Sequence, residues 1–235
     1  MESMPRSSRT RAIAAGPGRL NAETVVDAAL DLIARSGLEG LSMRALGQAL
    51  GVEAMSLYHW FPAKERLLDA IADRLIRKVE LPPLPATAEA WRRWMTEVAR
   101  AYRRMGLAHP RAFPLVAARR FLSPGAIVFI QRTIAANRIA GFDLRQAARL
   151  TRTIGASVNG IVLAELAAPA LTTPGRSDAA ERVLEEKDWN HVLRFFSRPE
   201  LDGAFEYGLG CLLDGALQTR RDARRNRTRR APSSG

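Results

Sequence analysis

The spacing of apolar residues limits the folds that this chain can adopt. Apolar residues recur three and four positions apart from residue 22 almost to residue 219. That spacing puts them on one face of a helix, whereas a half-buried strand alternates apolar and polar residues. With 235 residues, the chain can bury a core in one or two domains. The sequence therefore predicts an all-α protein.

Capping residues mark the ends of the first two helices. Asn21 precedes the first apolar stripe and Gly37 follows it. Ser42 and Gly51 enclose a second, shorter stripe in the same way. Asn and Ser side chains accept hydrogen bonds from free N–H groups at a helix start, and Gly adopts the left-handed backbone that ends many helices. Two helices with these limits are expected.

A third and a fourth helix complete the first unit of the chain. Phe61 precedes a proline, which disfavours helical backbone, so the third helix should end near Trp60. A fourth helix is expected over about 63–79. The proline-rich stretch 80–88 then separates residues 20–79 from the rest.

The remainder of the chain repeats the helical pattern. Residues 169–181 contain two prolines and a glycine, which predicts a long loop. Helices are expected at about 88–106, 110–120, 124–140, 143–168 and 200–221, with a further one near 188–197.

Positive charge is concentrated at the two ends of the chain. The formal net charge is +12, and much of it falls in residues 1–19 and 220–235, whereas residues 20–79 are close to neutral. We expect 1–19 to be a disordered basic arm and 222–235 to be a disordered Arg-rich tail. Solvated tails and arms that contact nucleic acid are both consistent with this composition.

The sequence also bears on the cellular compartment. No stretch approaches the roughly 18 apolar residues of a membrane helix, and no apolar segment follows the early arginines as it would in a secretory signal. The single cysteine, Cys211, cannot form an internal disulfide, which fits a reducing compartment. We expect a cytoplasmic protein without membrane contact.

The second and third helices together form a helix-turn-helix pattern, in which the second helix of the pair enters the DNA major groove. Leu57 and Phe61 are four positions apart and, with Val52, should face the first two helices. The side chains expected to face outward are Ala54, Met55, Ser56, Tyr58 and His59. Adjacent aromatic residues more often belong to a core, which is the alternative for this segment.

The outward side chains divide by chemistry. Tyr58, His59 and Trp60 carry ring O–H or N–H donors suited to the DNA backbone, and Lys64 opens the fourth helix, where free N–H groups also favour a phosphate. The residues suited to base edges are Ala54, Met55 and Ser56, and Arg44 could reach either a guanine or a phosphate.

Residues 28–73 resemble the DNA-binding domain of TetR-type (tetracycline-repressor-like) transcriptional regulators. The likeness covers the order of helices, the glycine before "LSMRALGQALGV", the Leu-Tyr pair of the third helix and the lysine that opens the fourth. It continues more weakly in 141–166 and 205–217. The resemblance implies a helix-turn-helix domain at 20–79, with the motif itself at about 41–61, and a C-terminal effector-binding and dimerisation domain at 80–221.

The resemblance also implies roles for single residues. Arg44 and Ser56 would face bases, and Tyr58 and Lys64 would contact phosphates of a palindromic duplex operator. Met55 stands where tetracycline repressors carry a proline, so their operator sequence is not transferred to this chain.

The effector implied by the resemblance differs from that of the tetracycline repressors. Those proteins supply histidines to a magnesium–tetracycline complex from the end of the fourth helix and from the sixth helix. Residues 78–84 and 113–121 contain no histidine here. His109 and His191 are isolated and should have capping or surface roles. We therefore expect a small-molecule effector other than magnesium–tetracycline, no metal site and no cofactor.

Candidate residues for an effector pocket lie on two predicted helices and at the start of a third. An aromatic and Met stripe runs along 91–105, where core packing is the ordinary explanation and a pocket wall is the alternative. The helix 143–168 carries polar exceptions, among them Thr153 and Ser157, whose role stays open. The pocket candidates are Trp91, Trp94, Met95, Tyr102, Phe113, Arg152 and Asn159.

Small residues on the helices 143–168 and 200–221 predict a dimer interface. They let helix backbones approach closely, as in a four-helix bundle made of two helices from each subunit. The residues expected there are Gly155, Gly160, Gly208, Leu212 and Gly215.

These patterns favour a homodimeric transcriptional repressor that a small molecule releases from its operator. A constitutive DNA-binding regulator that relies on its arginine tails is the alternative. An all-helical enzyme fits less well, because three scattered histidines and one cysteine form no catalytic or metal-binding pattern. We expect no enzymatic activity.

Overall fold

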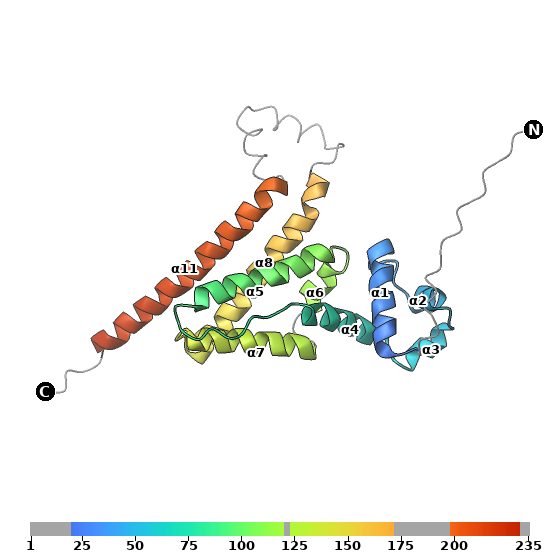
Figure 1. The fold of residues 1–235 in the computed structure, drawn as a ribbon, viewed down its shortest axis with the longest axis horizontal. Helices are drawn as coiled ribbons and strands as arrows, with labels where there is room; N and C mark the ends of the chain where they lie inside the picture. The colour runs from blue at the N-terminus through green and yellow to red at the C-terminus, as the bar shows by residue number, and fades with distance from the viewer. Residues whose placement is uncertain (1–19, 120–122, 172–197, 231–235) are drawn as a thin grey trace, which may run out of the picture.

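Every regular element in the described parts of the chain is a helix. Figure 1 shows the computed structural model, which describes residues 20–119, 123–171 and 198–230. The all-α prediction is confirmed. The predicted helix near 188–197 and most of the predicted loop at 169–181 lie outside the described residues, as do residues 1–19.

The first two helices have the predicted limits. Helix α1 covers Ala22–Ser36 and α2 covers Met43–Leu50. The Asn21 side chain accepts a hydrogen bond from the N–H of Thr24 (2.8 Å), and Ser42 Oγ accepts one from the N–H of Ala45 (3.1 Å). Gly51 ends α2 in the left-handed region (φ 70°), where glycine carries no steric penalty.

Helix α3 is shorter than predicted. It covers Ala54–Tyr58, after which the chain continues as a turn. The N–H groups of Trp60 and Phe61 both bond the carbonyl of Leu57, at 3.0 and 2.9 Å. The Phe61 bond spans four positions, as in an α-helix, so helical hydrogen bonding reaches the residue before Pro62 although the regular helix ends at Tyr58.

Helix α4 (Lys64–Arg77) joins this three-helix unit to the rest of the molecule. In Figure 1, α1, α2 and α3 lie together at one end, and α4 leads from them into the larger bundle. Its buried face, which includes Leu67, Ile71 and Leu75, packs on α1, α6 and α7. One helix is thus part of both cores.

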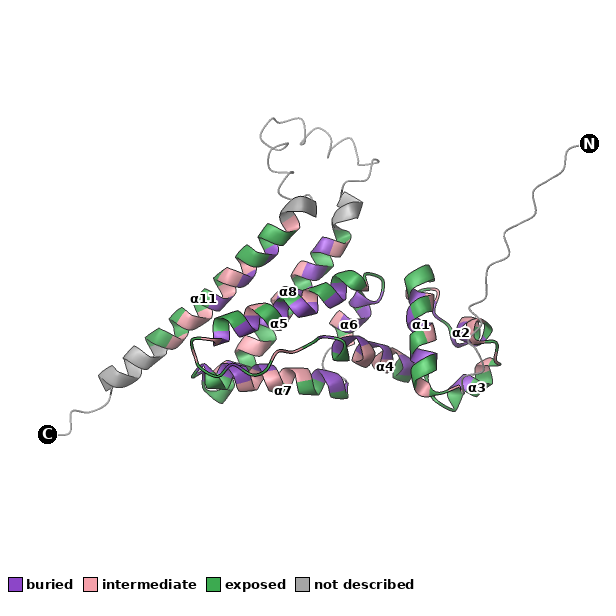
Figure 2. Cartoon of the chain, in the orientation of Figure 1, coloured by how far each residue is buried: buried purple, intermediate pink, exposed green. Residues whose placement is uncertain are grey.

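The larger bundle contains five described helices. They are α5 (Trp91–Ala108), α6 (Phe113–Arg119), α7 (Pro124–Ile139), α8 (Leu144–Leu171) and α11 (Arg198–Arg230). Helix α8 packs against α5, α7 and α11. Figure 2 shows buried residues where these helices meet and many exposed residues along α11. One side of α11 therefore faces solvent in the single chain.

The end of α11 corrects one boundary. The helix continues to Arg230, so the prediction that a disordered tail begins at residue 222 is wrong for 222–230. No Gly or Pro occurs between Ala216 and Arg230, and Arg is a strong helix former, so nothing local ends the helix at 222.

No single helix of the described chain is long and apolar enough to cross a membrane. Helices α6 and α7 reach that length and composition only when taken together, and they are bent by 68° to each other.

Candidate nucleic-acid interface and ligand cavity

Helix α3 directs two kinds of side chain in opposite directions. Leu57 is fully buried and Phe61 is 7% exposed, whereas Met55 is 73% exposed. Ser56, Tyr58 and the neighbouring His59 and Trp60 are also exposed, and Ala54 is half-buried. The inward direction predicted for Leu57 and Phe61 is confirmed. The candidate DNA-contacting residues of this segment lie on its solvent side, with Ala54 at the margin.

A close approach between α2 and α3 sets the position of this surface. A Cβ atom at Gly47 would lie 2.8 Å from the carbonyl oxygen of Val52 and 3.2 Å from the backbone nitrogen of Ala54. A larger residue at 47 would force the two helices apart. Sequence reasoning missed Gly47, although a glycine inside a helical pattern is a signal of close packing.

Two of the exposed rings contact each other. The rings of His59 and Trp60 meet edge to face, with centroids 5.1 Å apart and planes at 85°. Both rings are at the surface, so they are not part of the core beneath α3. The aromatic row thus divides as predicted, with Phe61 inside and the other three rings outside.

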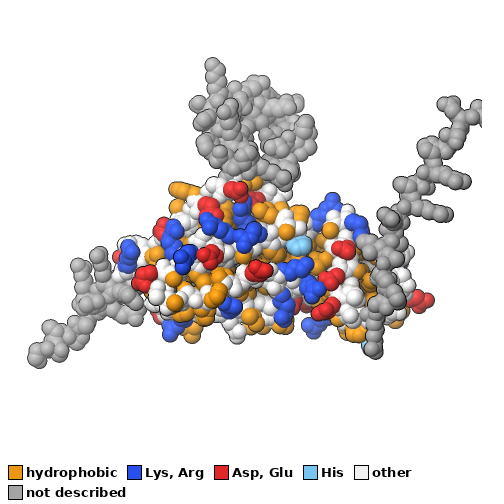
Figure 3. Space-filling model, in the orientation of Figure 1, with side chains coloured by type: hydrophobic (Ala, Val, Ile, Leu, Met, Phe, Trp, Pro, Cys, Tyr) orange, Lys and Arg blue, Asp and Glu red, His pale blue; other side chains and the backbone are white. Residues whose placement is uncertain are grey.

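Two cations lie next to this surface. Arg44 is exposed near the start of α2, and Lys64 is the first residue of α4. No side chain caps the N-terminus of α4, because Ala63 occupies the N-cap position. Free N–H groups and a lysine at one helix start are suited to a phosphate group. Elsewhere charges are mixed: Figure 3 shows acidic and basic side chains interspersed on the face in view.

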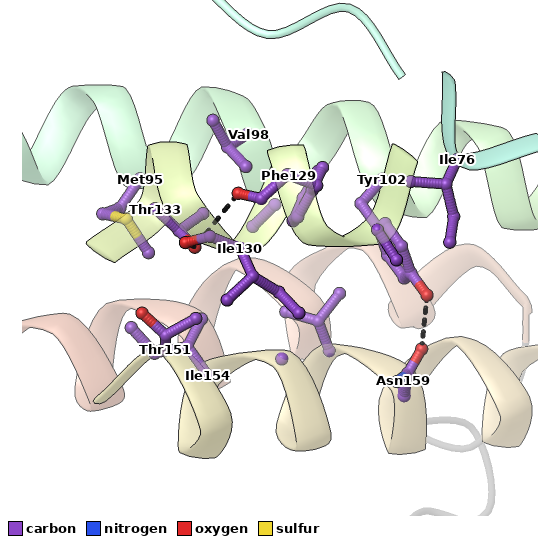
Figure 4. A pocket seen from close by; sticks show the side chains of 14 residues that line it. Ile76, Met95, Val98, Tyr102, Phe129, Ile130, Thr133, Thr151, Ile154 and Asn159 are labelled. Carbon is purple, nitrogen blue, oxygen red and sulfur yellow. Dashed lines mark hydrogen bonds between the residues drawn. The ribbon is translucent and has the colours of Figure 1, made fainter. Parts of the chain in front are cut away.

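A second feature is a cavity of about 70 Å³ between α5, α7 and α8. Met95, Tyr102 and Asn159, all predicted for a pocket, are among its lining residues. Figure 4 shows Met95 and Ile154 toward one end, and Tyr102 and Asn159 toward the other. The lining residues within the described part of the chain carry no charged side chain.

Polar groups in the cavity are few. The Tyr102 hydroxyl donates to Asn159 Oδ1 at 2.9 Å, which Figure 4 marks with a dashed line. Thr133 donates its hydroxyl proton to the Ile130 carbonyl at 2.8 Å, and Thr151 accepts from Asn137 at 3.0 Å. Asn159 Nδ2 has no hydrogen bond partner in the described part of the chain.

The other four pocket candidates lie elsewhere, which corrects their predicted position. Trp91 is fully buried and donates to Asn137 Oδ1 at 2.8 Å, and Trp94 donates to the Pro82 carbonyl at 3.3 Å. Phe113 lies behind Tyr102, with ring centroids 5.8 Å apart, and Arg152 faces solvent. Helical spacing identified which residues of α5 are buried. It did not identify which of those buried residues line the cavity.

The predicted dimer residues fall into two groups. Gly155 lines the cavity, so it lies toward the bundle interior rather than with the others. Gly160 and Gly215 are exposed, and Gly208 and Leu212 are half-buried on α11. A shallow groove between α8 and α11 includes Leu212 and Gly215. This region is open in the single chain.

Ion pairs hold α11 to α5. The Arg92 and Arg100 guanidinium groups donate to Asp214 and Glu206, each with its closest contact at 2.7 Å. The hydrogen bond from Arg100 lowers the pKa of Glu206, and that from Arg92 lowers the pKa of Asp214. Helical periodicity carries no signal for these long-range pairs.

The described residues contain no group of three or more His, Cys, Asp or Glu side chains that could hold a metal ion. His109 follows α5 and is half-buried; burial and the nearby Lys78 lower its pKa.

Comparison with known proteins identifies the family. The model of bacterial regulatory proteins of the tetR family matches residues 25–71, and that of the tetracyclin repressor-like C-terminal domain matches residues 84–220. The class A tetracycline repressor of transposon 1721 from Escherichia coli is 34% identical over 211 residues, covering 86% of this chain and 93% of that protein.

Solved structures agree with this match. ActR of Streptomyces coelicolor, in complex with actinorhodin, has a TM-score of 0.70 at 26% identity, covering 86% of this chain and 99% of that one. BioQ bound to its double-stranded DNA operator has a TM-score of 0.61 at 26% identity, covering 84% and 98%. The chain belongs to the TetR family of bacterial transcriptional regulators.

Proposed function

We propose that this TetR-family repressor binds a palindromic operator as a homodimer, with one α3 helix of each subunit in the major groove. A small molecule in the cavity between α5, α7 and α8 releases it. The observation that supports DNA reading is the exposure of Met55, Ser56 and Tyr58 on a helix that Leu57 anchors from behind. A reading helix needs this arrangement, because its position must be fixed while its outer side chains stay free.

The roles of the exposed residues follow from their chemistry. Ser56 and Met55 meet base edges, where a hydroxyl can bond a base and a thioether side chain can contact a thymine methyl group. Tyr58 and Lys64 bind phosphates, and the uncapped N-terminus of α4 adds free N–H groups to the same site. Base contacts set the preferred sequence, whereas phosphate contacts strengthen binding to any sequence.

The open faces of α8 and α11 form the dimer interface in this proposal. Gly160 and Gly215 are exposed, and a Cβ atom built at either position meets no heavy atom within 4 Å in the single chain. A second copy would cover these positions in a four-helix bundle. The distance between the two α3 helices of the dimer then depends on how the two subunits pack against each other in this four-helix bundle.

Helix α4 connects the cavity to the reading helix. Asp69 pairs with Arg119 of α6, and Asp73 accepts a hydrogen bond from the Gly125 N–H at the start of α7 (2.6 Å). A ligand that displaces α7 therefore displaces α4, which carries Lys64. Release requires two dimer geometries, one in which the spacing of the two α3 helices matches the operator and one in which it does not. The ligand must bind the second geometry more tightly than the first.

The effector in this proposal is not a magnesium–tetracycline complex. Among the residues that the structure describes, the cavity lining contains no His, Asp or Glu, so these residues offer no imidazole or carboxylate ligand to a divalent cation. The repressor acts in the cytoplasm, where its operator is located.

A gel-shift assay tests the proposal. The full chain is mixed with the DNA upstream of its own coding region in the presence of excess unrelated duplex, at modest salt. We expect a specific shift that Tyr58→Phe weakens. Arg93→Gln is the control, because the Arg93 side chain is 81% exposed on α5, which lies away from α3 and outside the proposed dimer faces of α8 and α11. A shift that unrelated DNA removes as efficiently as upstream DNA would refute sequence-specific reading.

A further inference from the structure

The amide of Asn159 is incompletely bonded although it is buried. The residue is 4% exposed, its Oδ1 accepts from the Tyr102 hydroxyl, and its Nδ2 has no partner in the described part of the chain. A buried donor without an acceptor is unfavourable, because it has lost its hydrogen bonds to water. Asn159 also lines the cavity, so a ligand bound there is the candidate acceptor for Nδ2.

A second buried asparagine in the same bundle shows the contrast. Asn137 is fully buried, yet its Oδ1 accepts from Trp91 and its Nδ2 donates to the Ala147 carbonyl and to Thr151. A structural asparagine is therefore satisfied within this protein. The amide that lacks a partner is the one at the cavity.

The rest of the cavity lining limits the ligand further. Its other polar side chains are Tyr102, Thr133 and Thr151, and each already has a hydrogen bond within the protein. None of the described side chains in the lining is charged and could balance an ionic ligand, and an unpaired charge in an apolar cavity is strongly unfavourable. The ligand that fits this lining is neutral and mostly apolar.

The cavity must widen to admit such a ligand. Its volume is about 70 Å³, whereas an engineered cavity of about 150 Å³ is known to bind benzene. Met95 lines one end, and its unbranched side chain adapts readily to a new neighbour. At Gly155 a Cβ atom would meet no heavy atom within 4 Å, so space is available there.

We infer that the effector is an uncharged molecule with an apolar ring body and a carbonyl oxygen that accepts a hydrogen bond from Asn159 Nδ2. This inference rests on the proposed function in one respect, because it takes the cavity as the effector site.

Two probes of the same shape test the inference on the full chain. Acetophenone carries a carbonyl oxygen where α-methylstyrene carries a CH₂ group, and benzoate adds a negative charge. Dissociation constants are measured by NMR titration of the isotope-labelled protein. We expect acetophenone to bind about tenfold more tightly than α-methylstyrene, which corresponds to about 1.4 kcal/mol, and benzoate to bind more weakly than either.

Two variants assign the preference to one atom. Asn159→Leu should remove the tenfold preference for acetophenone. Thr96→Val is the control, because it deletes a hydroxyl on α5 that bonds the Arg92 carbonyl and does not line the cavity, and it should keep the preference. Circular dichroism confirms that each variant folds. The comparison of the probes on the unchanged chain tests the inference even if a variant does not fold.

Equal affinities for the two neutral probes, or tighter binding of benzoate, would overturn the inference. The DNA-binding assay without ligand separates this outcome from failure of the proposed function. Specific DNA binding combined with equal probe affinities refutes only the ligand chemistry, whereas loss of specific DNA binding refutes the function itself.

Discussion

Helix α3 directs its polar side chains toward solvent, whereas the cavity has a polar side chain directed toward the interior of the bundle. Around α3, the core residue Leu57 lies behind the helix, and Ser56 and Tyr58 face solvent. In the larger bundle, the amide of Asn159 faces inward among apolar side chains. An exposed polar group is stabilised by water until a partner arrives, whereas a buried one requires a partner inside the protein. The exposed polar groups of α3 are therefore hydrated in the free chain, whereas Asn159 Nδ2 has no partner in the described part of the chain.

The largest expected effect on stability comes from changing Leu57, the buried residue behind α3. Leu57→Ala removes a fully buried side chain and should lower the free energy of unfolding by about 2 to 5 kcal/mol. Met55→Ala, two positions away but exposed, should change it by less than about 0.5 kcal/mol. Urea unfolding followed by circular dichroism measures both. Equal losses would show that α3 is not anchored through Leu57.

The two buried asparagines give the next largest difference. Asn137→Leu leaves the indole N–H of Trp91 without its acceptor and should cost about 1 to 3 kcal/mol of stability. Asn159→Leu removes an amide that is already half unsatisfied, so its cost should be smaller. If Asn159→Leu were the more destabilising change, the amide would be structural and the cavity would not need a ligand acceptor.

A smaller effect separates phosphate contacts from base contacts. Lys64→Ala should weaken binding to every duplex alike and reduce the slope of log affinity against log salt by about 1. Lys78→Ala, which follows the other end of α4, is the matched control and should leave the slope unchanged. Ser56→Ala should instead change which duplex is preferred. Fluorescence anisotropy at several salt concentrations measures these differences; a change in preferred sequence in Lys64→Ala would contradict the assignment.

The smallest effect concerns pH. Burial and Lys78 lower the pKa of His109 in the folded chain below its ordinary value of 6.5. The unfolded chain therefore takes up this proton first as the pH falls, so stability is full above about pH 6.5 and declines below it. Replacing His109 with Gln should flatten the stability curve between pH 7 and the lowered pKa. An unchanged slope in urea unfolding would assign the pH dependence to other groups.

Local chemistry made the DNA-reading region predictable from the sequence. Asn21, Ser42 and Gly51 define helix ends through bonds to neighbours within four positions, and the spacing of Leu57 and Phe61 defines the inward side of α3. All of these signals lie close together along the chain. The end of α3 lies two residues before the predicted end near Trp60, because Trp60 and Phe61 both bond the Leu57 carbonyl in a turn that apolar spacing does not distinguish from a helix.

The cavity depends on contacts between distant residues, which periodicity does not describe. Trp91 and Trp94 looked like pocket residues, but their N–H groups find acceptors on Asn137 and Pro82. Arg152 is on the apolar helix α8 but on its solvent side. Of the candidates, Met95, Tyr102 and Asn159 line the cavity, and the missing partner of Asn159 becomes visible only when the three helices are assembled.

Selection of binding sites from a random duplex library, with the full chain as the binding protein, tests DNA reading by α3 most directly. We predict enrichment of a palindrome whose half-sites are centred about one helical turn apart, and a change of preferred base when Ser56→Ala is used in the same selection. Enrichment of no sequence, or an identical site for the chain and for Ser56→Ala and Met55→Ala, would contradict the proposal that α3 reads the operator.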